Sequence, residues 1–148
     1  MPASTISGLP EATTDLARLK ADLDEHGYCL AAEALSPSQL ARVRERLEAQ
    51  AAAERALDLG FGNDVHMDAT NQWVGMLINK GAPFVELATD PVGLALVSHV
   101  LGTEHLLSVL EAHVVNAGGS PMALHSDQWW MPFPVAPDAA YPRVGAIT

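Results

Sequence analysis

The stretch LHSDQWWMPFP, residues 124–134, decides the fold hypothesis for this chain. His125 and Asp127 are two residues apart, so on a β-strand both side chains point to the same face. One imidazole nitrogen and one carboxylate oxygen on one face are two of the three ligands of a facial iron(II) site. His125 and Asp127 are therefore candidate metal ligands, on a strand expected to begin near Met122, although a His-x-Asp triplet also arises by chance in a chain of this composition.

Two of the three tryptophans of the chain follow this triplet directly. Trp129 and Trp130 can wall a dry pocket beside the metal, and packing beneath the following loop explains either one equally well. We assign Trp129 as a candidate substrate contact and Trp130 as a candidate cofactor contact.

A second His-x-Asp triplet, His66-Met67-Asp68, lies in a polar, glycine-bearing segment between Asp58 and Thr70. Such a loop is typical of a substrate-facing segment, which makes His66 and Asp68 candidate substrate-binding residues. A rival metal set of His66, Asp68 and His125 stays open, although a loop does not fix a common direction for its side chains.

Size and charge limit the class of protein. The chain has 148 residues, 49% of them apolar, which predicts a single folded domain over residues 1–148. Its net charge of −10 argues against nucleic-acid or anionic-membrane binding. One cysteine, Cys29, excludes a disulfide framework within the chain. Residues 1–14 do not resemble a signal peptide, so we expect a cytoplasmic protein.

Three segments carry helix signals. The first begins at Leu16 and is ended by Gly27. The second begins at the capping box of Ser36-Pro37-Ser38-Gln39 and continues towards Leu57, and the third spans 91–101. Strands are predicted later and between the helices, at 28–32, 73–78, within 106–116 and at 143–148. Helices followed by strands predict an α+β fold whose sheet is incomplete in this chain.

From Tyr28 onward the chain resembles the phytanoyl-CoA dioxygenase family. Four stretches carry the resemblance, in the family's order and near its spacing. They are Gly27-Tyr28 leading into Leu35-Ser36, MLINKG at 76–81 followed by Phe84, Leu87 and Ala88, the helix from Asp90-Pro91 to Gly102, and Pro121 through LHSDQ at 124–128.

The resemblance implies a double-stranded β-helix of jelly-roll or cupin type with helices packed on it. It also implies an iron(II) and 2-oxoglutarate-dependent dioxygenase that hydroxylates an aliphatic carbon of a small metabolite or acyl derivative. His125 and Asp127 match the family's metal ligands, and His113 and Asn116 lie on a strand that in the family helps to hold 2-oxoglutarate. The expected partners are the small-molecule substrate, O2 and 2-oxoglutarate.

The sequence departs from the family pattern after Asp127. The family places a second histidine ligand and then a cosubstrate-binding arginine further along, and no histidine follows Asp127 here. Arg143 does not match that arginine, so the resemblance covers the N-terminal half of such a domain and leaves the third ligand open. A non-catalytic binding or interaction module derived from the same fold is the alternative hypothesis.

Overall fold

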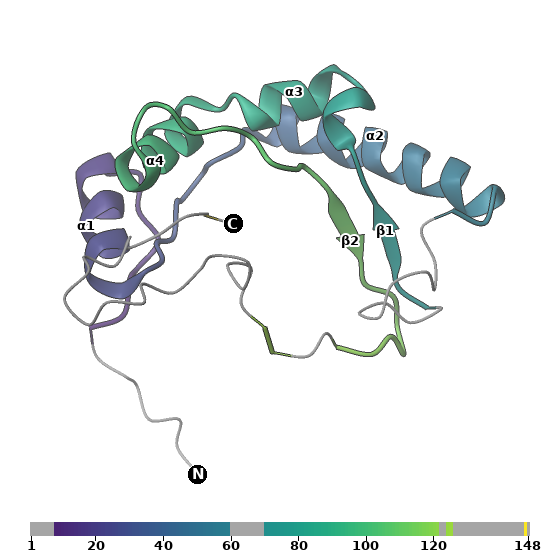
Figure 1. Ribbon diagram of the computed structural model, residues 1–148, viewed down its shortest axis with the longest axis horizontal. Helices are drawn as coiled ribbons and strands as arrows, with labels where there is room; N and C mark the ends of the chain where they lie inside the picture. The colour runs from purple at the N-terminus through teal and green to yellow at the C-terminus, as the bar shows by residue number, and fades with distance from the viewer. Residues whose placement is uncertain (1–7, 60–69, 122–123, 126–146, 148) are drawn as a thin grey trace, which may run out of the picture.

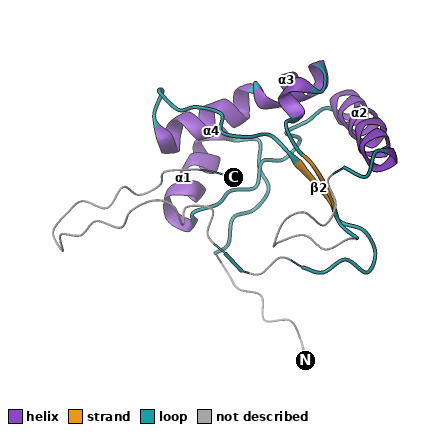
Figure 2. Ribbon diagram, turned by 45° about the vertical axis from the view of Figure 1, so that its right-hand side comes forward, coloured by secondary structure: helices purple, strands orange, loops and turns teal. Residues whose placement is uncertain are grey.

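The computed structural model describes residues 8–59, 70–121, 124–125 and 147. This part of the chain is α+β: helices are its main regular structure, and two short strands form an antiparallel sheet (Figures 1 and 2). The elements in chain order are α1 Leu16–His26, α2 Pro37–Ala56, β1 Gln72–Val74, the 3-10 helix η1 Leu77–Asn79, α3 Ala82–Ala88, α4 Pro91–Leu101 and β2 Ala112–Val114.

Local capping signals define the ends of the helices. The Ser36 hydroxyl accepts the Gln39 backbone N–H at 3.2 Å, and the Gln39 side-chain oxygen accepts the Ser36 N–H at 2.9 Å. Gly27 ends α1 in the left-handed conformation with φ 79°, where a side chain would be strained. The Asp90 carboxylate accepts the Val92 N–H at 2.9 Å and begins α4. The three predicted helices are therefore confirmed.

The strand predicted at 73–78 is only partly correct. Gln72 pairs with Val114, and the register continues through Trp73–His113 to Val74–Ala112. The extended backbone then stops, because Met76 turns into the left-handed region with φ 54°. The Leu77 N–H donates to the Leu110 carbonyl at 2.8 Å, which anchors η1 beside the sheet. The short helix α3, which the pattern did not predict, follows directly.

Other strand predictions were too long. In place of a strand at 28–32, an isolated parallel bridge joins Thr13 to Ala31, held by Thr13 N–H to Leu30 O at 3.0 Å and Ala32 N–H to Thr13 O at 2.9 Å. A strand needs an extended partner, and helix α1 begins only three residues after Thr13. Within 106–116 only Ala112–Val114 is a strand. The strand predicted at 143–148 falls almost wholly outside the described residues.

The main core lies between α2, β1, η1 and α3. Its buried side chains are Ala51, Val74, Leu77 and Phe84, with Phe84 and Val74 fully buried. Figure 1 shows α2 and α3 together at one end of the β1–β2 pair. This arrangement leaves the region around β2 and the chain before it with few buried apolar side chains among the described residues.

Helices α1 and α4 form a second packed pair, with Leu19 and Leu96 as buried residues. A ring nitrogen of His99 on α4 lies 3.1 Å from the Asp24 carboxylate on α1. In the described part of the chain, no helix by itself has the length and apolar composition to cross a membrane. Only α3 and α4 taken together, with a 45° bend between them, meet that criterion.

Candidate functional site

One end of the sheet connects to both of the segments that the sequence singled out. The chain enters β1 through Thr70 and Asn71, directly after the loop that contains His66 and Asp68. It leaves β2 through a turn at 117–118 and reaches His125. The antiparallel pairing of β1 with β2 therefore brings the end of the segment before Thr70 and the start of the segment after β2 to the same end of the sheet.

Side chains tie these two strand ends together. Asn71, which is buried, accepts the Asn116 backbone N–H on its side-chain oxygen at 3.2 Å. Its side-chain nitrogen donates to the Ser120 carbonyl at 3.0 Å. The Asn116 side-chain nitrogen donates in turn to the Thr70 carbonyl at 2.6 Å. We call these three hydrogen bonds between Thr70–Asn71 and Asn116–Ser120 the asparagine clasp.

The structure places one of the two predicted metal ligands. His125 is exposed in the short described segment 124–125. Asp127, the tryptophans Trp129 and Trp130, and the loop residues His66 and Asp68 lie outside the described residues. Among the residues that the structure does describe, no three His, Cys, Asp or Glu side chains are grouped to hold a metal ion.

The donor chemistry of the triplet suits iron(II). An imidazole nitrogen and a carboxylate oxygen are the donor types that non-haem iron takes in a facial site, and both are present within the segment 125–127. His125 and Asp127 therefore remain predicted metal ligands, and the third protein ligand is not assigned.

The two predicted cosubstrate residues on and after β2 have different surroundings. The His113 ring packs edge-on against Trp73 on the paired strand, with ring centres 4.3 Å apart. Its Nε2 atom lies 3.7 Å from the Glu111 carboxylate, and about a third of the side chain is exposed. Asn116 lies beyond the strand and belongs to the asparagine clasp. The structure therefore does not bring these two side chains together.

A buried polar network lies behind β1, and the sequence did not reveal it. Lys80, in the turn after η1, forms an ion pair with Glu54 on α2. Burial by itself would raise the pKa of Glu54, but hydrogen bonds from Lys80 and Gln50 and the charge of Lys80 lower this pKa below its ordinary value. The fully buried Gln72 accepts from Arg55 at 2.8 Å and donates to the Ala51 carbonyl at 2.9 Å.

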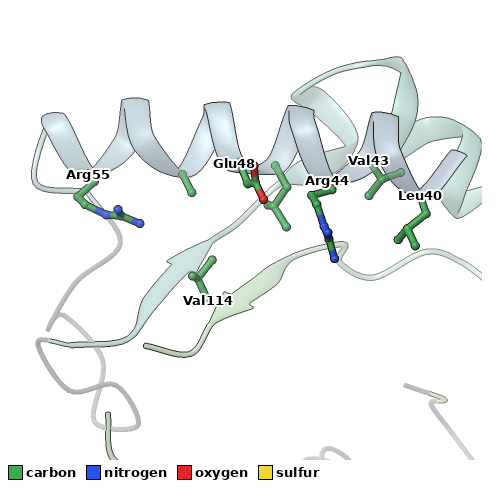
Figure 3. A pocket seen from close by; sticks show the side chains of 8 residues that line it. Leu40, Val43, Arg44, Glu48, Arg55 and Val114 are labelled. Carbon is green, nitrogen blue, oxygen red and sulfur yellow. The ribbon is translucent and has the colours of Figure 1, made fainter. Parts of the chain in front are cut away.

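An apolar groove of about 450 Å³ runs between α2 and β2 (Figure 3). Apolar side chains on one face of α2 and Val114 on β2 form the walls of the groove. Charged side chains of α2 flank these walls. The lining residues are Leu40, Val43, Arg44, Leu47, Glu48, Ala51, Arg55 and Val114. Leu40, Val43 and Leu47 lie at helical spacing on one face of α2, and this face is only partly covered in the structure.

Comparison with known proteins finds a similar protein that is named a dioxygenase. Over 129 residues the chain is 29% identical to dioxygenase af480 of Aspergillus fumigatus, and these residues are 86% of this chain and 42% of that protein. The chain thus spans less than half the length of this curated relative. No family model and no solved structure matches the chain. The sequence is therefore similar to part of a protein named a dioxygenase.

Proposed function

We propose that this chain is part of an iron(II) and 2-oxoglutarate-dependent dioxygenase of the phytanoyl-CoA dioxygenase type. The similarity to dioxygenase af480 along 86% of the chain carries this proposal. The His-x-Asp triplet at 125–127 gives it a chemical basis, because its two donors are of the kind that iron(II) takes. The substrate class is a small metabolite or acyl derivative with an aliphatic carbon to hydroxylate.

Each candidate residue has a distinct role in this proposal. His125 binds the metal through one ring nitrogen, and Asp127 binds it through a carboxylate oxygen. His113, Asn116 and Trp130 are the candidate contacts to 2-oxoglutarate. His66, Asp68 and Trp129 contact the substrate, and the two tryptophans keep water from the pocket. Bound iron supplies the oxidising chemistry with O2 and 2-oxoglutarate, while the protein orients the reactants.

Turnover of 2-oxoglutarate in the complete protein tests this proposal. Replacing His125 or Asp127 by Ala should lower succinate formation at least about 100-fold, because each variant loses a direct metal ligand. The circular dichroism spectrum should not change, since His125 is exposed. His105→Ala is the matched control: this histidine contacts the Gly102 carbonyl and belongs to neither candidate set. Wild-type turnover in His125→Ala would refute the assignment of this ligand.

A second variant separates the two possible metal sets. His66→Ala should weaken substrate affinity and leave the slow decay of 2-oxoglutarate without substrate unchanged. If iron binding is lost instead, His66 is a ligand and the rival set of His66, Asp68 and His125 is favoured. Absence of iron binding in the wild-type protein would favour the non-catalytic module.

A further inference from the structure

The asparagine clasp replaces backbone pairing at the end of the sheet. The ladder between β1 and β2 covers only the three pairs from Gln72–Val114 to Val74–Ala112. Before Gln72 and after Val114, the two segments are joined by hydrogen bonds of the Asn71 and Asn116 side chains. Asn71 uses both its side-chain oxygen and its side-chain nitrogen in these hydrogen bonds, and burial of an amide is unfavourable without such partners.

Gly119, which has no side chain, leaves room for the Asn71 side chain. A Cβ atom at position 119 would lie 2.0 Å from the Asn71 side-chain oxygen and 2.7 Å from its carbonyl carbon. No flexible side chain relieves this overlap, because the clashing group is the amide that makes the hydrogen bonds. The close approach of the turn to Asn71 therefore depends on glycine at this position.

The clasp lies between the two segments of the candidate site. Ser120 precedes His125 by five residues, which span at most about 18 Å when extended. Thr70 follows His66 by four residues, or at most about 14 Å. Fixing Ser120 and Thr70 to one another therefore limits how far the two segments can separate.

We propose that Asn71 is a positioning residue of the dioxygenase site: it fixes the exit of the chain from β2 and thereby the placement of His125 for metal binding. The inference rests on the proposed function and names a residue that contacts neither metal nor substrate in it. Asn71 acts through the backbone of Asn116 and Ser120.

Cobalt(II) binding to the complete protein, followed by the visible absorption of the metal, tests this proposal. Asn71→Ala removes the side-chain hydrogen bonds to Asn116 and Ser120, and it should weaken cobalt affinity about tenfold or more and change the ligand-field spectrum. Gly119→Ala should have the same effect by displacing the Asn71 side chain. The controls are Asn79→Ala, an exposed asparagine at the end of η1, and Gly75→Ala, where an added Cβ has no neighbour within 4 Å.

The outcomes separate this inference from the proposed function. Weaker binding and an altered spectrum in both clasp variants, with wild-type behaviour in both controls, support positioning by Asn71. Wild-type affinity and spectrum in Asn71→Ala, while His125→Ala loses the metal, would overturn it and leave the proposed function standing. If the wild-type protein binds no cobalt, the proposed function fails and the positioning role fails with it.

A variant that fails to fold needs a separate test. If Asn71→Ala does not fold, the decision passes to Asn116→Ala, which removes only the bond to the Thr70 carbonyl. A folded Asn116→Ala protein should show a smaller but measurable loss of cobalt affinity, about threefold for a change near 0.7 kcal/mol. Unchanged affinity in that variant would count against the clasp.

Discussion

The two sides of the β1–β2 pair differ sharply in how well they are covered. On the side of β1, the helices α2 and α3 bury Phe84 and Val74 completely and enclose the Glu54–Lys80 ion pair. In the chain that leads into and out of β2, Leu106 and Val115 are 90% and 75% exposed, although Ala112 and Val114 of β2 itself pack against the core. The same two strands thus border a packed core and an open apolar surface.

This contrast separates the part of the chain that supplies most of the folding stability from the part that leaves apolar side chains exposed. A small domain gains its stability from apolar area removed from water, and that area is concentrated under α2. The region of β2 buries little apolar area. It contains the asparagine clasp, the apolar groove and the segment that leads to His125. Variants on the two sides should therefore differ in both size and kind of effect.

The largest effect is expected in the packed core. Phe84→Ala removes a fully buried ring and should lower the free energy of unfolding by about 3–5 kcal/mol. Urea denaturation followed by circular dichroism measures this change. The neighbouring Val85, 43% exposed on the same helix, is the matched control, and Val85→Ala should cost less than about 1 kcal/mol. Equal effects of the two variants would show that the core is not where the structure places it.

The buried ion pair should have the next largest effect. Lys80→Met leaves the Glu54 carboxylate partly buried without its cation and should cost about 2 kcal/mol at neutral pH. The pKa of Glu54 is lowered in the folded protein, so the stabilisation is complete above its ordinary value of 4.5. It is lost as the pH falls through the lower folded value. Thermal unfolding from pH 7 to pH 3 should show this acid loss in the wild type, and Lys80→Met should show less of it.

The exposed apolar residues near β2 should promote association between chains rather than lower the stability of the fold. Exposed apolar residues beside a strand edge promote pairing with other chains, so the 148-residue chain purified by itself should form oligomers or aggregates. The double variant Leu106→Lys/Val115→Lys should shift size-exclusion chromatography towards monomer and change the unfolding free energy by less than about 0.5 kcal/mol. A monomeric wild-type chain at high concentration would contradict this view of the open side.

A small effect on stability is expected at the α1–α4 contact. The His99–Asp24 pair is largely accessible to water, and such pairs contribute about 0–1 kcal/mol. His99→Ala should therefore lower the unfolding free energy by no more than about 1 kcal/mol. A loss comparable to that of Phe84→Ala would mean that α1 and α4 form part of the main core.

The sequence predicted what local signals specify. The capping box at Ser36, the glycine after His26 and the Asp90-Pro91 start each determine a helix end through neighbours in the chain, and all three were predicted correctly. The strand at 73–78 was overestimated because the left-handed turn at Met76 depends on contacts with a distant segment, including Leu110.

The candidate site likewise has residues that the local sequence reveals and residues that only the fold brings together. The His-x-Asp triplet is visible in the letters at 125–127 because its two donors are neighbours in the chain. Asn71, Asn116 and Gly119 come from places up to 48 residues apart, since position 119 minus position 71 is 48. No periodicity marks them, and only the pairing of β1 with β2 brings them together. The double-stranded β-helix stays a prediction, because the described residues contain a single two-stranded sheet.

Anaerobic titration of iron(II) into the complete protein, monitored by calorimetry, tests the central claim most directly. The proposal predicts one bound iron per chain in the wild type and in His66→Ala. It predicts a loss of affinity of at least about 100-fold in His125→Ala and in Asp127→Ala. Wild-type iron affinity in either ligand variant would contradict the assignment of the metal site to His125 and Asp127.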